Sequence, residues 1–338
     1  MLSQERRDRH NVVALLVAVV ALASLALHGA SGPAQGPGVP VCMVAGGLLL
    51  AFLVPAVQVR LRGLVERAPS LVVWIPTAFA LYGVVATAAL GAPRWFNLLA
   101  WPVCISAALL AIGRRADGEL PPLRFLGAGL ALWILAGIWD RAVQIRVPGD
   151  TRLGLAYLTC VALALYLFAI ARPRRSFDVR LGLSLRELGT ALGAVAVLAG
   201  AVIPLGILVG FLHWEPRWLG VSYAVARIFG LILFVGIPEE LLFRGVYQEA
   251  FSRLWSPRTG WIVASALFGL VHIVKHARLH GWWHAPLAAI ASLNWQYALL
   301  ATFAGLAYGW VYSRTGKLGA AAVTHGVVDW LWSTWLGS

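Results

Sequence analysis

The sequence predicts an all-α membrane protein, a polytopic bundle of transmembrane helices. Of its 338 residues, 60% are hydrophobic and 12% are charged, which is about half the charged fraction of an average soluble domain. The mean hydropathy is +0.79. The apolar residues gather into long runs, several of which reach the roughly 17 to 25 residues needed to cross a bilayer. Together these observations exclude an ordinary soluble domain.

Eleven apolar runs are expected to form helices in order along the chain, which gives roughly eleven membrane spans. The fifth run is short for a full crossing. The eighth is expected to continue past a proline kink at Pro238 to about Leu254. The runs cover residues 12–30, 38–57, 71–91, 96–113, 125–139, 153–171, 188–212, 219–237, 261–275, 285–312 and 318–336.

Membrane topology explains the net charge of +13 better than nucleic-acid binding does, because the basic residues are spread over short loops. With the N-terminus in the cytoplasm, inner segments hold 19 of the 27 Lys and Arg residues, outer segments hold seven, and Arg227 lies within a span. The bias predicts a multi-pass protein of a bacterial-type cytoplasmic membrane, with no nucleic-acid partner. The inner residues are Arg6, Arg7, Arg9, Arg60, Arg62, Arg67, Arg114, Arg115, Arg124, Arg172, Arg174, Arg175, Arg180, Arg186, Arg244, Arg253, Arg258, Arg314 and Lys317.

Two regions are expected, with a boundary in the basic loop 172–180. Residues 1–175 hold six apolar runs whose polar residues lie in the connections, whereas nearly all intramembrane charge follows residue 219. Residues 176–338 are therefore expected to carry the function. The basic segment before the first run resembles a signal peptide, but the long run favours a retained helix.

The three cysteines lie inside apolar runs without paired spacing, which argues against a disulfide framework or a thiolate metal site. They are interpreted as packing residues. They are Cys42, Cys104 and Cys160.

Ionisable residues within the apolar runs of the second region need an explanation, since charge at bilayer depth costs several kcal/mol. Glu239 and His272 lie about 22 and 16 Å from the shared turn at 256–260, at 1.5 Å per residue. His325 and Asp329 lie about 10 and 16 Å from the same membrane face and share one helix face. These depths predict one cavity within the C-terminal bundle.

A buried carboxylate beside an imidazole is a means of making a general base that activates water. Glu240 precedes Arg244 by four residues, the favourable orientation for an ion pair, which leaves Glu239 to face the cavity. His325 with Asp329 is expected to polarise a scissile carbonyl or stabilise the oxyanion, provided that one of them carries a proton.

Together these residues resemble the signatures of the CPBP family, the CAAX-protease and bacteriocin-processing intramembrane proteases, also called Abi or Rce1-like. The resemblance covers about residues 180–338 and leaves the N-terminal region unexplained. The motifs are Glu239-Glu240-x-x-x-Arg244, Phe268-x-x-x-His272 and His325-x-x-x-Asp329.

The resemblance implies an intramembrane endopeptidase in which Glu239 and His272 activate water. His325 and Asp329 would assist at the oxyanion, and Glu240 and Arg244 would support the site. Members have been described both as metalloproteases and as glutamic-type enzymes, so a divalent metal such as zinc, held by Glu239, His272 and His325, is left open. Asp329 stands where the family often has Asn, which makes its donor role depend on protonation.

The implied substrate is a membrane-associated, lipidated or C-terminally anchored protein, cleaved near the cytoplasmic half of the bilayer. Two other classes stay open: a transporter or lipid-binding scaffold that uses the midplane charges, and a catalytically silent family member acting as an adaptor. Histidines every four residues from His272 to His284 suggest zinc ligands on one helix face, but a Trp- and His-rich interface loop is the preferred interpretation. The absence of His-Glu-x-x-His disfavours a site-2 type of zinc protease.

Overall fold

The computed structural model describes most of the chain, and the described residues are helical apart from one short hairpin, β1–β2, and a two-residue antiparallel pair formed by the distant strands β3 and β4. The expected first span at 12–30 and the histidines at 276, 280 and 284 lie outside the described residues. The described ranges are 38–89, 95–112, 121–139, 144–147, 151–173, 179, 182–218, 220–273 and 292–337.

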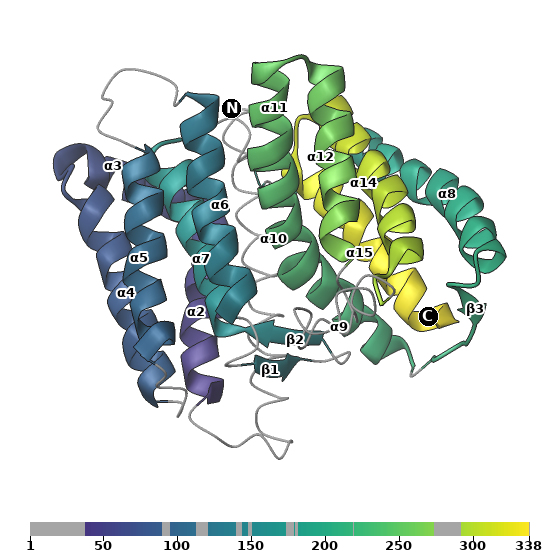
Figure 1. Cartoon of the computed structure of the whole chain (residues 1–338), viewed down its shortest axis with the longest axis horizontal. Helices are drawn as coiled ribbons and strands as arrows, with labels where there is room; N and C mark the ends of the chain where they lie inside the picture. The colour runs from purple at the N-terminus through teal and green to yellow at the C-terminus, as the bar shows by residue number, and fades with distance from the viewer. Residues whose placement is uncertain are drawn as a thin grey trace.

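The first group of helices corresponds to the expected N-terminal region and lies on the left in Figure 1. The β1–β2 hairpin, which the sequence analysis did not predict, joins α6 to α7. The elements are α2 (Gly38–Leu53), α3 (Pro55–Arg67), α4 (Leu71–Ala89), α5 (Trp95–Ile112), α6 (Pro122–Trp139), β1 (Gln144–Val147), β2 (Thr151–Gly154), α7 (Leu155–Leu165) and the π-helical η1 (Tyr166–Ala171).

The second group lies beside the first and carries all the predicted site residues (Figure 1). Its elements are α8 (Leu185–Leu208), β3 (His213–Trp214), α9 (Val221–Leu231), η3 (Ile232–Gly236), α10 (Ile237–Glu240), η4 (Leu241–Gln248), α11 (Glu249–Leu254), α12 (Pro257–His272), α14 (Trp295–Thr315), α15 (Leu318–Trp335) and β4 (Leu336–Gly337).

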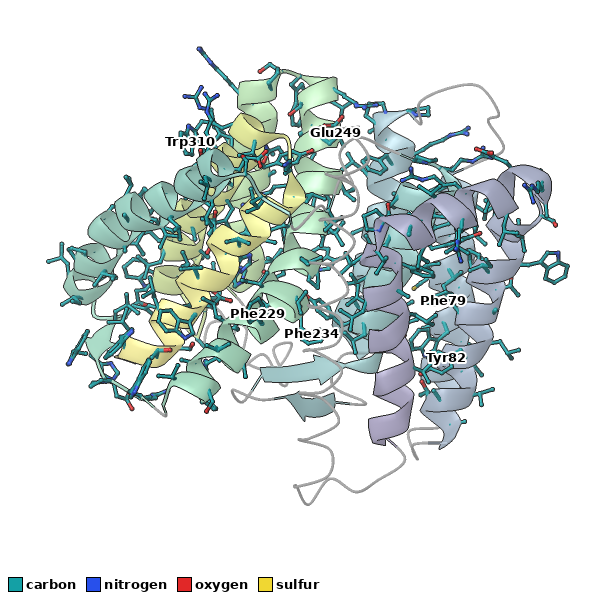
Figure 2. The ribbon with its side chains drawn as sticks, turned by 180° about the vertical axis from the view of Figure 1, so that it is seen from behind. Phe79, Tyr82, Phe229, Phe234, Glu249 and Trp310 are labelled. Atoms are coloured by element: carbon teal, nitrogen blue, oxygen red, sulfur yellow. The ribbon has the colours of Figure 1, made fainter. Side chains whose placement is uncertain are left out.

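One hydrophobic core joins the two groups. Leu135 of α6 and Leu163 of α7 belong to the same buried cluster as Phe234 and Ile237 of the second group. Figure 2 shows Phe234 between the two groups. The chain therefore packs across the boundary that the basic loop suggested.

Three helices in the described part of the chain are long and apolar enough to cross a membrane, namely Leu71–Ala88, Leu185–Leu208 and Val221–Leu254. A fourth candidate is the pair Gly46–Leu53 and Pro55–Arg67, which is bent by 90°. These helices agree with the prediction of a helical integral membrane protein. The number eleven stays a prediction.

The helix that carries the two glutamates runs without a break from Val221 to Leu254, as the apolar pattern past Pro238 predicted. The π-helical segments η3 and η4 lie on either side of Pro238. A π-turn absorbs the backbone irregularity that proline causes and changes which face the following residues present. The π-helical turns on either side of Pro238 therefore change the direction in which the side chains after them point.

Capping residues fix the ends of the helices around the site. Ser256 accepts a hydrogen bond from the Thr259 amide at the start of α12, and the Asn294 side chain accepts one from the Tyr297 amide at the start of α14. Gly316 ends α14 in the left-handed conformation, with a φ of 66°, which glycine adopts at little cost.

Candidate active site

The four predicted catalytic residues line one cavity of about 120 Å³ in the second group of helices. Glu239 comes from α10, His272 is the last residue of α12, and His325 and Asp329 come from α15. The rest of the wall is mainly apolar, with Leu198, Val202, Phe211, Leu300 and Trp332 among its residues. The structure thus brings the predicted residues to one place, as the depth argument expected.

Glu240 binds two partners in the buried interior. Its Oε2 lies 3.0 Å from Arg244 Nε, and neither side chain is exposed. Its Oε1 lies 2.9 Å from His325 Nδ1. The ion pair with Arg244 was predicted from the spacing of four, but the contact with His325 was not. A carboxylate at Nδ1 fixes the orientation of the ring and directs Nε2 elsewhere.

His325 Nε2 faces the two carboxylates of the cavity. It lies 3.6 Å from Asp329 Oδ2 and 3.9 Å from Glu239 Oε2. The first distance bears out the prediction that His325 and Asp329 share one helix face. Both distances are too long for a direct hydrogen bond, so His325 Nε2 lies close to Asp329 and Glu239 without a direct bond to either.

Arg244 of η4 contacts both α12 and α14 next to the cavity. Its Nη2 donates to the carbonyl of Gly305 on α14 at 2.7 Å. Its guanidinium lies 5.2 Å from the ring centre of Phe268 on α12 and 5.6 Å from that of Tyr308 on α14. A buried charge requires such partners, and Arg244 therefore supports the cluster without lining the cavity.

His272 is held by its own helix. Its Nδ1 lies 2.6 Å from the carbonyl oxygen of Phe268, which can only accept, so Nδ1 is the protonated nitrogen and Nε2 is the basic one. The ring also packs edge-on against Tyr297, with centroids 4.9 Å apart. In this tautomer the unprotonated Nε2 can accept a hydrogen bond.

Aromatic residues position the imidazoles, a feature that the sequence analysis missed. Tyr308 is stacked on His325 with ring centroids 4.5 Å apart and an interplanar angle of 16°. Phe268, interpreted from sequence as a packing residue without chemistry, packs against both His272 and His325. The spacing of Tyr297 and Tyr308, eleven residues or about three helical turns, was the signal available for one shared face.

Two glycines allow α15 to approach the glutamate-bearing helix closely. A Cβ on Gly326, next to His325, would lie 2.8 Å from backbone atoms of Ile232. A Cβ on Gly236, three residues before Glu239, would lie 2.6 Å from the carbonyl oxygen of Ala322. Small residues at helix crossings permit such contact in membranes, and here the crossing sets the distance between the histidine and the glutamates.

Two pairs of glycines spaced four residues apart, Gly189 with Gly193 and Gly305 with Gly309, differ in how closely they approach a neighbouring helix. A Cβ on Gly305 would lie 3.1 Å from the Ser265 carbonyl oxygen, and one on Gly309 would lie 2.5 Å from Trp261. Gly189 and Gly193 have no such neighbours within 4 Å. Of these two pairs, only the one on α14 is therefore a site of close helix contact.

The donor atoms do not fit a metal ion as they are arranged. Among the described residues, no three or more His, Cys, Asp or Glu side chains are grouped as a metal site requires. In the proposed ligand set of Glu239, His272 and His325, the Nδ1 partners of both histidines leave Nε2 as the nitrogen that could face an ion, but the side chains are not grouped closely enough to share one.

A second pocket of about 460 Å³ continues from the cavity towards β3 and β4. It shares Phe211, Tyr297, Asp329, Trp332 and Leu336 with the cavity. Its remaining walls include polar side chains, namely Arg217, Asn294 and Ser333. We call this second pocket the vestibule.

The fold and the site define a helical membrane protein with an acid and imidazole cluster at a cavity within its bundle. Residues 221–331 match the family model described as type II CAAX prenyl endopeptidase Rce1-like. The match confirms the predicted resemblance of this segment to the Rce1-like family, a family of proteases. The match includes every predicted site residue but begins after α8, later than the expected residue 180. Searches of curated proteins and of solved structures give no match.

Proposed function

We propose that this protein is an intramembrane endopeptidase in which Glu239 and His272 activate a water molecule. The observation that supports this proposal most directly is the environment of the Glu239 Oε2 atom. This atom is buried and has no hydrogen-bond partner among the described residues, yet it belongs to a side chain that lines the cavity. Buried polar atoms without partners are rare, and a water molecule in the cavity would supply the missing hydrogen bond.

The proposed reaction begins when Glu239 accepts a proton from water as the water oxygen attacks the carbonyl carbon of the scissile peptide. His272 Nε2, the basic nitrogen of the ring, helps to orient that water. Collapse of the tetrahedral intermediate breaks the C–N bond, and the proton held by Glu239 passes to the leaving amine. The products are a new carboxyl terminus and a new amino terminus.

The oxyanion of the intermediate needs a proton donor. His325 supplies it when both ring nitrogens are protonated, because Nδ1–H then donates to Glu240 and Nε2–H points towards the cavity. Glu240 and Arg244 are positioning residues in this scheme, since they hold His325 and do not touch the substrate. The carboxylate of Asp329, whose Oδ2 lies 3.6 Å from Nε2, attracts the positive charge of the protonated ring.

The substrate class that fits is a membrane-anchored protein. The apolar wall formed by Leu198, Val202 and Trp332 suits a hydrophobic anchor segment or lipid. The proteolytic domain is proposed as 176–338, and whether a lipid group is required is left to experiment.

The helices of residues 1–175 are proposed to support the glutamate-bearing helix. A Cβ on Gly129 of α6 would lie 2.6 Å from Cγ1 of Val246, so α6 and η4 are in close contact. Trp133 packs edge-on against Tyr247, with centroids 6.4 Å apart. Val246 and Tyr247 do not line the cavity. Their contacts with α6 would keep the glutamate-bearing helix from shifting along its axis.

The test uses processing of a membrane substrate by variants that remain folded in detergent. Glu239→Gln and His272→Ala are expected to abolish cleavage. Glu249→Gln is the matched control, because Glu249 lies ten residues further along the same helix and pairs with Arg253. Full processing by both Glu239→Gln and His272→Ala would reject the proposal.

A further inference from the structure

The helix α3 is set apart from its neighbours at both ends by proline. Val54 precedes Pro55 and has an extended backbone, with a φ of −78° and a ψ of 118°, as steric contact with a following proline favours. Ala68 precedes Pro69 and is also non-helical, with a φ of −133° and a ψ of 79°. The first break bends the chain by 90° from the end of α2, and Figure 2 shows α3 lying across that end.

Helix α3 lies at an edge of the apolar part of the bundle. The next helix, α4, is apolar enough to cross a membrane from Leu71, four residues after α3 ends at Arg67. Trp74, in the first turn of α4, is 65% exposed, and exposed tryptophans gather where a membrane meets water. A helix that bends by 90° from the preceding apolar helix and ends beside such a tryptophan runs along the membrane surface.

One face of α3 packs on the protein. Val65 is buried in the core that joins the two groups of helices. Arg62 donates from Nε and Nη2 to the carbonyl oxygen of Ala169 in η1, at 2.9 and 2.7 Å. The carbonyl groups at the end of a helix lack helical partners and carry partial negative charge, so Arg62 is held in place there. These contacts fix the rotation of α3 about its own axis.

The opposite face of α3 carries two exposed arginines in line. Arg60 and Arg67 are seven residues apart, which is two helical turns or about 10 Å, and both side chains are exposed. Gly63 lies between them, and a Cβ there would meet no atom within 4 Å. Glu66 is the single acidic residue of α3, so the face is positively charged with open space between its two arginines.

Apolar side chains flank the two arginines. Val59 is 60% exposed and Leu64 is 49% exposed, and helical spacing places them on either side of the line from Arg60 to Arg67. Apolar side chains gain from burial among acyl chains, whereas guanidinium groups extend to the polar headgroups. Arginine also binds phosphate through two parallel hydrogen bonds. At a membrane surface, an anionic phospholipid meets both requirements.

We propose that the outer face of α3, formed by Val59, Arg60, Leu64 and Arg67, binds an anionic phospholipid through its phosphate. The two apolar side chains contact the acyl chains near the glycerol, and the two guanidinium groups contact phosphate oxygens. The site lies outside the residues that match the family model and does not depend on the proposed hydrolysis. Because the inner face of α3 is anchored to η1 and to the joint core, a bound lipid stabilises the first group of helices.

Native mass spectrometry of the full chain in detergent tests the site, with phosphatidylglycerol or phosphatidylcholine as the added lipid. Wild-type protein is expected to bind the anionic lipid in preference to the zwitterionic one. Arg60→Gln with Arg67→Gln is expected to weaken phosphatidylglycerol binding about thirtyfold, since each basic residue at an anionic surface contributes roughly fivefold. The charge-matched control is Arg186→Gln with Arg258→Gln, which removes two exposed arginines of α8 and α12 and is expected to bind as wild type does.

Arg60→Lys with Arg67→Lys separates charge from folding, because it keeps both positive charges. This variant is expected to bind phosphatidylglycerol with close to the wild-type affinity. Glycerol phosphate, a soluble molecule with the same phosphate group, is expected not to compete. Competition by glycerol phosphate at the concentration of the lipid would assign the site to a soluble anion and overturn the proposal. Equal binding of both lipids by wild type, undiminished binding by the glutamine pair, or an equal loss in the control or the lysine pair would overturn it as well.

Discussion

Replacing Glu240 by glutamine should destabilise the protein more than any other single loss of carboxylate charge in the described structure. The substitution keeps the shape but removes the charge that faces Arg244 Nε at 3.0 Å and His325 Nδ1 at 2.9 Å. Arg244 then remains unexposed with Gly305 O as its hydrogen-bond acceptor. Removing one partner of a buried ion pair typically costs about 3–5 kcal/mol.

The matched comparison is Glu249→Gln on the same helix. Its ion pair with Arg253 has the same spacing of four, but these side chains are 25% and 28% exposed, and pairs of that kind contribute about 0.3–0.5 kcal/mol. The difference between the two variants should therefore be several kcal/mol. Reversible unfolding in detergent, followed by circular dichroism, measures both. Equal losses would refute the view that Glu240 is the buried centre of the site.

The other predictions concern helix contacts and metal. Gly326→Val should lower both stability and processing, with overpacking that costs about 1–3 kcal/mol, whereas Gly189→Val, which meets no neighbour within 4 Å, should leave both unchanged. Gly129→Val should reduce processing, because its side chain would displace Val246, although Gly129 lies outside the family match. The control is Gly127→Val, whose Cβ would meet only Ala111 at 3.7 Å. Dialysis against a chelator should leave cleavage intact, and loss of cleavage restored by zinc would contradict the arrangement of donors described above.

The contacts that could be predicted from sequence are those within one helix. The spacing of four predicted the Glu240–Arg244 pair and the approach of His325 to Asp329, because residues four apart share a helix face. Counting residues from a common turn also placed Glu239, His272 and Asp329 at similar depth, since the rise per residue is fixed.

The contacts between helices could not be predicted in the same way. The bond from Glu240 to His325 depends on how α10 and α15 rotate about their axes, and the π-helical segments η3 and η4 alter that rotation. In the sequence, nothing distinguishes Tyr308 and Phe268 from other apolar residues. Their role becomes visible only in the structure, where both pack against an imidazole ring. Hydropathy also extended the run at 261–275 beyond His272, where α12 ends, because apolar composition continues past the helix.

The central claim is that Glu239 performs peptide hydrolysis inside the bundle, and a comparison of protein termini in membranes tests it most directly. Membranes are taken from cells that express wild-type protein, Glu239→Ala or Glu249→Gln at equal levels. The account predicts at least one membrane protein whose cleaved terminus is present with wild type and with Glu249→Gln and is replaced by the uncleaved form with Glu239→Ala. Identical termini in all three membranes, with the substrate present, would contradict it.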